Sequence, residues 1–385
     1  MTCFDRVNET AELWRQIKDD KNLLMLAPRR IGKTVLLHHL RDTAADNGYR
    51  AIVLDVEGFR EEKDFFRECC AAIQEELSTG TRVMNAFGEK LSRLFKGGND
   101  GADWRHWLLH TDWKDFANHL LAHLNDHGDD PPWLILIDEL PNFLDSLRRR
   151  DGDQALGDFL YWLRNMRQKH THVRWFHTGS IGLDSVARRY NVEGALNDLE
   201  PLPLDPFTPD TARAFLTSIG DKRGCTFEAD AIDTILQRLG WLSPYYLDKI
   251  GEDACQTARQ SDTPNTIDIA LAHTAMDHML DLSKRTYWST WREHLDRNFP
   301  EPDRTRLYAL LETVAKGDAT TGASQDTLLQ RLNRSGEPVG AGILRDLLDT
   351  LLTDGFLEVV TLDGDNRYRF RMNLLREWWL RYVVL

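Results

Sequence analysis

The sequence has few cysteines, no long apolar run and no excess of positive charge. Its five cysteines include no Cys-x-x-Cys pair, which argues against a disulfide framework or structural zinc and favours a reducing compartment. No stretch approaches the roughly 18 apolar residues of a membrane-spanning helix. The net charge of −13 argues against strong non-specific binding to nucleic acid, because that binding requires cationic side chains.

The remaining composition is that of an ordinary globular protein, with 42% hydrophobic and 28% charged residues. A chain of 385 residues predicts two or three domains of roughly 100–200 residues each. The segment Met1–Arg6 lacks the charged and apolar regions of a secretory signal. We therefore expect a cytoplasmic protein with no membrane partner.

The most informative segment is residues 27–34, Ala-Pro-Arg-Arg-Ile-Gly-Lys-Thr. An apolar strand pattern precedes it and a helical pattern begins at Lys33, which predicts a phosphate-binding loop at a helix N-terminus. In that loop Lys33 would reach the β- and γ-phosphates of a nucleotide, and Thr34 would ligate Mg²⁺. The predicted nucleotide contacts are Pro28, Arg29, Arg30, Ile31, Gly32, Lys33, Thr34 and Val35.

Two questions about this loop stay open at the level of sequence. Ala27 stands where the usual motif has its first glycine, so the chain must enter the loop in a conformation that alanine can adopt. Arg29 and Arg30 fit either contact with phosphate or salt bridges. A chance Gly-Lys-Thr in an ordinary turn is the alternative to the whole assignment.

A second segment argues against that alternative. Residues 133–139 form a short apolar run that ends in Asp138 and Glu139. This pattern is typical of a buried parallel strand with carboxylates at its C-terminal end. Asp138 would hold Mg²⁺, directly or through water, and Glu139 would orient and polarise the attacking water. A solvated Asp-Glu at a loop start is the alternative, and the phosphate loop makes it the weaker one.

Strand and helix patterns alternate along the first 205 residues, which predicts an α/β fold with a doubly wound parallel sheet. The expected strands are 23–27, 51–56, 133–137 and 173–178, and the expected helices are 33–47, 63–77 and 154–169. Residues 79–130 form a helical insert with patterns at 84–95 and 113–125. We assign 1–205 to this core.

Two further regions follow. Residues 206–300 read as four short helices without strands, the first capped by Thr208 with Pro209 at its first position, and then an aromatic helix over 284–299. Residues 301–385 read as helices at 304–315, 325–333 and 343–353, a hairpin of 356–361 with 367–372, and a last helix at 374–382. This order is typical of a winged helix.

Together these motifs resemble the AAA+ ATPases and, within them, the archaeal-type ATPase family, which is related to the origin-recognition and STAND ATPases. The family's form of the phosphate loop matches residues 28–34, and its Asp-Glu-Leu-Pro matches 138–141. An apolar-x-x-Arg box matches Phe4–Val7, Gly-Ser matches 179–180, and Pro-Tyr-Tyr-Leu matches 244–247. The resemblance implies an AAA+ core, an all-α lid, a winged helix, and ATP with Mg²⁺ as cofactors.

The resemblance also implies roles for single residues. Ser180, or alternatively Thr178, takes the sensor position near the γ-phosphate, so the expected catalytic residues are Glu139, Lys33 and Ser180. Pro244 and its neighbours would pack on the adenine. Phe4 and Val7, in the box that also contains Arg6, could line the other side of the base. Plain packing of Phe4 and Val7, and a backbone bond from Thr178, are the alternatives.

The chain departs from the family in two respects. Many members carry a nuclease-like domain after an Arg-Glu-Trp-Trp helix, here 376–379; because this sequence ends at Leu385, we expect no nuclease activity. No arginine can be assigned as an arginine finger. Arg188 and Arg189 follow the sensor strand and could reach a neighbouring subunit, although a solvated helix-end pair is favoured.

DNA contact is a weaker hypothesis. Arg367, Arg369 and Arg371 alternate along the second strand of the hairpin, so they share one face and form a small basic stripe. The expected recognition helix, 343–353, carries Asp346 and Asp349, which suit the major groove poorly. We favour a solvated strand face over phosphate contact.

The sequence therefore predicts an ATPase that hydrolyses Mg-ATP and rearranges its lid and winged helix to control a protein effector or its own oligomer. One alternative is a nucleotide-gated, STAND-like module with little hydrolysis of its own, acting with a separately encoded effector, in a role that would suit defence. The other is a winged-helix DNA-binding regulator.

Overall fold

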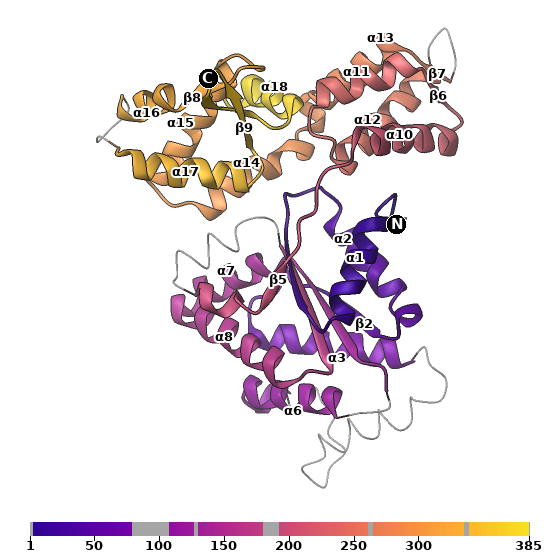
Figure 1. The fold of residues 1–385 in the computed structure, drawn as a ribbon, viewed down its shortest axis with the longest axis vertical. Coiled ribbons are helices and arrows are strands. Elements are labelled where there is room, and N and C mark those ends of the chain that lie inside the picture. The colour runs from indigo at the N-terminus through magenta and orange to yellow at the C-terminus, as the bar shows by residue number, and fades with distance from the viewer. Residues whose placement is uncertain are drawn as a thin grey trace. The chain divides into compact units, whose positions relative to one another are not determined.

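A computed structural model of the chain describes residues 3–78, 108–126, 130–179, 192–260, 265–334 and 339–384. The chain divides into two compact units (Figure 1). The first comprises Met1–Ala27 and Lys33–Leu204, and the second comprises Pro28–Gly32 and Asp205–Leu385. The middle of the phosphate loop therefore groups with the C-terminal residues.

The first unit is built on a parallel sheet of five strands in the order β2-β3-β4-β1-β5. The strands are Asn22–Leu26 (β1), Arg50–Asp55 (β2), Trp133–Asp138 (β3), Val173–Gly179 (β4) and Leu199–Pro201 (β5). Every residue of β3 and β4 is buried, which explains why these strands read as continuous apolar runs. The carboxyl ends of β1, β3 and β4 meet at one edge of the sheet.

The helices of this unit whose bounds are described accompany the sheet. They are Val7–Lys18 (α1), Lys33–Asp42 (α2), Glu62–Ser78 (α3), Trp113–Asn125 (α6), Leu140–Asp151 (α7) and Asp153–Lys169 (α8). Short 3₁₀ turns lie at Ala45–Asn47 (η1) and Glu193–Leu196 (η2).

Aromatic side chains join three of these helices in the core. Phe66 of α3 stacks on Trp113 of α6 with ring centroids 5.7 Å apart, and Trp162 of α8 meets both rings edge-on at 5.3 and 5.1 Å. Aromatic pairs at these separations add to the stabilisation that burial already supplies. The insert helix α6 is thereby fixed to the sheet-flanking helices.

The second unit begins with a helical lid. Its helices are Pro209–Arg223 (α10), Ala229–Leu239 (α11), Pro244–Ala258 (α12) and Ile269–Met279 (α13), followed by the 3₁₀ turn Leu282–Lys284 (η3) and Thr286–Asn298 (α14). The Thr208 hydroxyl caps α10 by accepting from the amide of Thr211 at 3.2 Å. Two short strands, Thr226–Phe227 (β6) and Thr266–Ile267 (β7), pair in parallel.

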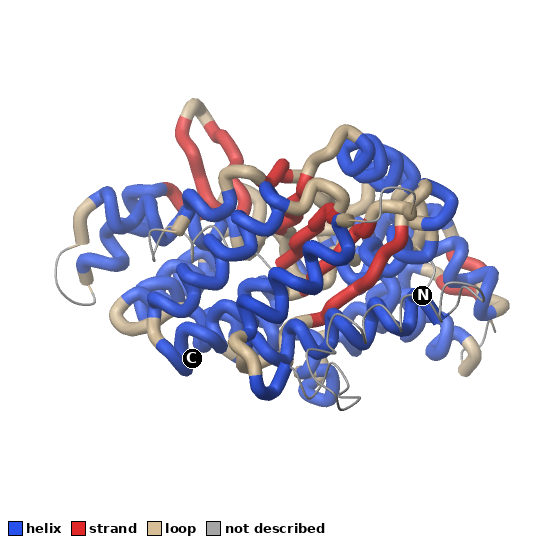
Figure 2. The backbone as a smooth tube through the Cα atoms, turned by 90° about the horizontal axis from the view of Figure 1, so that it is seen from below, coloured by secondary structure: helices blue, strands red, loops and turns tan. Residues whose placement is uncertain are grey.

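The rest of this unit is the winged helix. It contains Asp303–Lys316 (α15), Gln325–Asn333 (α16), Ala341–Thr353 (α17) and Asn373–Tyr382 (α18), with the strands Ala323–Ser324 (β8), Leu357–Leu362 (β9) and Asp365–Phe370 (β10). Asp363 and Gly364 turn the hairpin with φ of 52° and 88°, as a two-residue turn requires. The strands β9 and β10 project from the helices around them in Figure 2.

The structure confirms the predicted fold class, with a parallel α/β core followed by a helical lid and a winged helix. The expected strands and helices lie within a few residues of their predicted ends, apart from the helix pattern at 84–95, which falls outside the described residues. Helices α1 and α7 were not predicted, nor were the short strands β5, β6, β7 and β8. The lid is therefore not free of strands.

Candidate nucleotide-binding site

The segment between β1 and α2 has the backbone of a tight loop. Arg30 and Gly32 adopt left-handed conformations with φ of 69° and 100°. Glycine takes such a conformation without strain, whereas arginine does so only when its surroundings hold it there. Ala27 is fully buried with an ordinary negative φ, so an alanine at the first position of the loop strains nothing.

Lys33 stands at the start of α2, where the first amide groups of the helix lack partners within the helix. Its side chain is 5% exposed and its Nζ donates a hydrogen bond to the Ala27 carbonyl, at 2.8 Å. The ammonium group is thus folded back into the loop, where it adds positive charge to the positive end of the helix dipole. The arrangement can attract a phosphate group.

Asp138, at the end of β3, is the centre of the site. Its carboxylate accepts from the Thr34 hydroxyl at 2.5 Å and from the Thr178 hydroxyl at 2.6 Å, and it is 2% exposed. Thr34 belongs to α2 and Thr178 to β4, so three elements distant in sequence meet at one carboxylate. Of the two sensor candidates, Thr178 is the one that the structure describes in contact with this group.

Glu139 follows directly in a left-handed conformation, with φ of 57°. Its amide donates to the Asp138 carboxylate at 3.1 Å. The Asn142 amide donates to the Glu139 carboxylate at 3.3 Å and to that of Glu57 at 3.4 Å. Sequence reasoning missed Asn142 and Glu57, although Asn142 lies three residues after Glu139, a spacing that brings side chains together at a helix start.

Gly179 at the end of β4 allows the start of α7 to approach. A Cβ atom at this position would lie 2.6 Å from Cδ and Cγ of Pro141. Only a residue without a side chain leaves room for that contact. The close approach holds the first turn of α7, and with it Glu139, beside the strand that carries Thr178.

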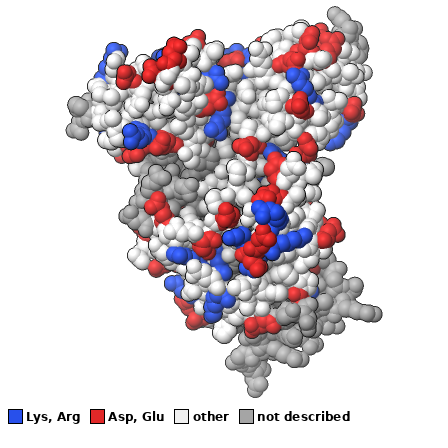
Figure 3. Space-filling view, viewed as in Figure 1, with Lys and Arg blue, Asp and Glu red and all other residues white. Residues whose placement is uncertain are grey.

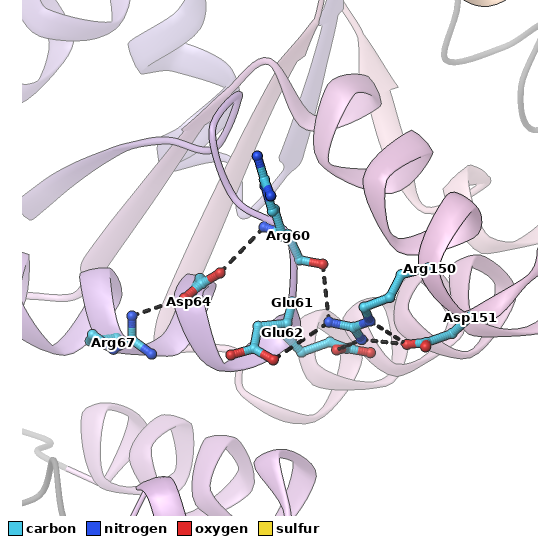
Figure 4. Close-up of polar contacts among 7 residues, drawn as sticks. All are labelled: Arg60, Glu61, Glu62, Asp64, Arg67, Arg150 and Asp151. Carbon is cyan, nitrogen blue, oxygen red and sulfur yellow. Dashed lines mark hydrogen bonds and ion pairs between the residues drawn. The ribbon is translucent and has the colours of Figure 1, made fainter.

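Charged groups fasten the far end of α7 to the start of α3 (Figure 4). Arg150 donates to the backbone carbonyl of Arg60 at 3.0 Å and to the carboxylate of Glu62 at 2.8 Å, and it also pairs with Asp151. The carboxylate of Asp64 accepts from the Arg60 amide at 3.3 Å. These contacts fix the loop that follows β2, from which Glu57 reaches Asn142.

A buried basic pair lies behind Thr178 on β4. The ring of His177 is fully buried beside the Arg167 guanidinium, with 3.4 Å between Nε2 and Nη1. Burial first, and the nearby positive charge second, hold the pKa of His177 well below its usual range. Arg167 in turn forms an ion pair with Asp198 at 2.7 Å. His177 is therefore neutral near pH 7.

Within the second unit, the lid holds the loop residue Arg30. Its guanidinium lies 4.0 Å from the ring centroid of Tyr245 and donates to the Thr286 carbonyl at 3.3 Å. The Ser243 hydroxyl, fully buried at the start of α12, donates to the Arg30 carbonyl at 2.6 Å. Three contacts thus impose the left-handed conformation of Arg30.

Phosphate contact and salt bridging are the two sequence-based alternatives for Arg29 and Arg30. Arg29 forms no ion pair with any described residue, and its Nε is buried without a hydrogen-bond partner there. Pro28 packs against Gly355, and a Cβ atom added to this glycine would lie 2.9 Å from the proline ring. Salt bridging is therefore excluded for Arg29 within the described part of the chain, and Arg30 contacts an aromatic ring and a carbonyl instead.

Some of the remaining predicted site residues are described, and the others lie outside the described residues. Ser180 and the arginines at 188 and 189 lie outside them. Arg6, 8% exposed, pairs with Glu9 at 2.6 Å, whereas Val7 is 72% exposed. Pro244 opens α12 in the second unit. Their roles around an adenine stay predictions.

Comparisons with known proteins bear on the fold that carries this site. Residues 16–186 match the family model of the AAA domain. The Walker-type ATPase of Pyrococcus abyssi shares the fold with a TM-score of 0.66 at 17% identity, covering 98% of this chain and 95% of that one. The ORC2 protein of Aeropyrum pernix, solved as ADPNP–ADP complexes, is similar with a TM-score of 0.60 at 13% identity, covering 99% of this chain and 95% of that one. No curated protein matches the sequence.

Residues 16–186 accordingly match an AAA domain, and the chain shares its fold with the Walker-type ATPase and the ORC2 protein. None of the described helices is long and apolar enough to cross a membrane.

Proposed function

We propose that this protein binds and hydrolyses Mg-ATP and transmits the state of the nucleotide to its lid and winged helix. The observation that carries the proposal is the pair of hydrogen bonds that Thr34 and Thr178 donate to Asp138. They bring together the helix start that would hold the phosphates and the strand that would sense them. The complex of the Aeropyrum ORC2 protein with ADPNP and ADP supports nucleotide binding by this fold.

The residues of the site fit a magnesium ion. Magnesium prefers oxygen ligands, and the oxygen atoms of Thr34 and Asp138 face each other directly. These two residues would hold the ion. When bound, the ion would neutralise charge on the phosphate oxygens.

Each protein group then has a defined task in our proposal. Lys33 and Arg29, whose guanidinium forms no ion pair with any described residue, bind phosphate oxygens. Glu139 takes a proton from the attacking water, while Asn142 holds its carboxylate in place. Thr178 keeps the Asp138 carboxylate oriented, and Gly179 keeps α7 close enough for Glu139 to reach the water.

The contacts of Arg30 support coupling to the C-terminal elements. Tyr245, which stacks on Arg30, precedes Tyr246, whose ring stacks on Trp288 with centroids 4.7 Å apart. The Tyr246 hydroxyl accepts from the indole of Trp291 at 2.8 Å, and Trp291 meets Phe356 of the winged helix edge-on at 4.9 Å. A loop that changes its backbone around a phosphate would disturb this chain of contacts.

No observation favours DNA contact as a second function. Arg367 donates to the carbonyls of Thr321 and Gly322, both at 2.8 Å, and Arg369 pairs with Glu358 at 2.6 Å. Two members of the predicted basic stripe are thus committed to the protein itself. On the face drawn in Figure 3, positive and negative side chains are interspersed. A protein effector or a second copy of the chain remains our expected partner.

The proposal is tested by phosphate release from Mg-ATP, measured for the wild type, Lys33→Ala and Glu139→Gln. We expect continuous release by the wild type, no nucleotide binding by Lys33→Ala, and tight ATP binding with at least a hundredfold slower release by Glu139→Gln. Tight binding without release by the wild type would refute intrinsic hydrolysis and favour the nucleotide-gated module. No binding by any of the three would refute both.

A further inference from the structure

The second unit contains a cleft between its lid and its winged helix. The cleft has a volume of about 450 Å³, which is within the range of small-molecule sites. The lid contributes Phe207, Trp241 and Leu242 to its walls. The winged helix contributes the charged residues Glu358, Arg369 and Arg371. None of these residues takes part in the nucleotide site described above.

Arg371 is the unexplained group in this cleft. Its side chain is half-buried, and no hydrogen bond, ion pair or ring contact joins its guanidinium to any residue that the structure describes. Burial lowers the pKa of this guanidinium from its ordinary value, and the carboxylates of Glu358 and Asp205 oppose that change from a distance. An arginine removed from water in this way costs free energy unless another group pairs with it.

The other two arginines on the same strand face have hydrogen-bond partners. Arg367 donates to two backbone carbonyls, and Arg369 donates to Glu358 at 2.6 Å and to the Thr320 carbonyl at 3.2 Å. Because Glu358 is paired with Arg369, no described carboxylate forms an ion pair with Arg371, and Glu358 and Asp205 act on its charge only from a distance. The charged lining therefore carries a net positive charge at one wall.

The part of the lining that the lid contributes is aromatic and apolar. Phe207 and Trp241 are 6% and 4% exposed, and the buried Nε1 of Trp241 has no hydrogen-bond partner among the described residues. The position of this wall is fixed, because Gly240 allows Asn373 to approach and a Cβ atom on that glycine would lie 3.2 Å from the asparagine amide. The ion pair of Arg238 with Glu377, at 2.8 Å, holds the same joint.

We propose that this cleft is a binding site for a small molecule that carries a carboxylate or phosphate group on a flat apolar body. Arg371 binds the oxyanion, since guanidinium groups pair with both oxyanions through two parallel hydrogen bonds. The apolar body lies against Phe207 and Trp241. Such a ligand would bridge the lid and the winged helix and oppose any change in their mutual arrangement.

The test is a titration of the full-length protein with 2-naphthoate, 2-naphthyl phosphate and the uncharged 2-naphthylmethanol. Excess Mg-ADP is present so that the phosphate loop does not bind the phosphate probe. Binding is measured by calorimetry for the wild type and for Arg371→Gln. The matched control is Arg381→Gln, because Arg381 is an exposed arginine on α18. Thermal unfolding of each variant verifies that it is folded.

We expect one saturable site for at least one charged probe, with at least tenfold weaker binding to Arg371→Gln and no change for Arg381→Gln. The uncharged probe should bind weakly and equally to all three proteins. Stronger binding of naphthoate would identify a carboxylate site, and stronger binding of naphthyl phosphate a phosphate site. The proposal is wrong if neither charged probe binds the wild type, or if Arg371→Gln binds them as tightly. Because no step requires ATP hydrolysis, its failure would leave the proposed function intact.

Discussion

The substitution Gly179→Ala tests the geometry of the nucleotide site. The added Cβ atom would lie 2.6 Å from two atoms of Pro141, whereas ordinary contacts lie at 3.4–4 Å. Either the end of β4 or the first turn of α7 must therefore move by about 1 Å, and overpacking of this kind costs about 1–3 kcal/mol of stability. Because a proline ring cannot rotate away, we expect the backbone to yield.

The same movement reaches the proposed catalytic groups. Thr178, adjacent to Gly179, donates to Asp138 at 2.6 Å, and a lost hydrogen bond to a charged group costs about 1.5–3 kcal/mol. If that bond is made in the transition state, the loss corresponds to about a tenfold to hundredfold lower kcat. We expect this decrease together with a lower melting temperature.

The assay compares phosphate release and thermal unfolding of Gly179→Ala with those of Gly157→Ala. Gly157 lies within helix α8, where a Cβ atom would meet only Cγ1 of Val192, at the ordinary distance of 3.5 Å. Alanine is a better helix former than glycine, so this control should gain about 0.5–1 kcal/mol of stability and keep its activity. Wild-type activity and stability in Gly179→Ala would refute the argument, and so would equal losses in both variants.

Four further predictions concern other parts of the molecule. Asn142→Ala should lower kcat about fivefold with an unchanged KM, because the two long hydrogen bonds from its side-chain amide together contribute about 1 kcal/mol. An unchanged phosphate-release rate would contradict this. Arg30→Ala should abolish the change in tryptophan fluorescence that ATP induces in the wild type. Arg30→Lys should keep part of this change, because lysine retains the positive charge but lacks the planar guanidinium that stacks on Tyr245. A full signal in Arg30→Ala would disprove the coupling. The pKa of His177 is lowered in the folded protein, so the unfolded chain binds a proton first as the pH falls. The free energy of unfolding should therefore decrease below about pH 6.5, by up to about 1.4 kcal/mol per pH unit. Urea unfolding at pH 7 and pH 5 should show a smaller loss of stability for His177→Gln than for the wild type, and an equal loss would rule this out. Burial raises the pKa of the Cys69 and Cys255 thiols to about 12, so neither should react with a thiol reagent at pH 8 until the protein unfolds; mass spectrometry showing rapid native modification would overturn this.

Local patterns in the sequence were sufficient to predict the frame of the site. The buried strands read as apolar runs because both faces of the sheet are covered, and the spacing around Lys33 and Asp138 locates the loop and the acidic strand end. The alternation of the wing arginines with buried residues was also readable, because strand side chains alternate between faces.

Features that depend on tertiary contact could not be predicted in this way. Asn142 lies on α7, which was not predicted because a proline near its start and its many charged residues obscure the apolar period. The contact of Gly179 with Pro141 requires the pairing of strands that are distant in sequence. Alternation placed Arg371 on the polar face of the wing, but only the folded unit brings the lid residues beside it.

The most direct test of our account identifies the nucleotide that stays bound after incubation with Mg-ATP. The wild type and Glu139→Gln are each separated from free nucleotide, denatured, and analysed for ATP and ADP. We predict ADP on the wild type and ATP on Glu139→Gln, because only the intact carboxylate takes a proton from the attacking water. This readout detects even a single turnover. ATP on both proteins, or ADP on both in equal amounts, would contradict the assignment of Glu139 as the catalytic base.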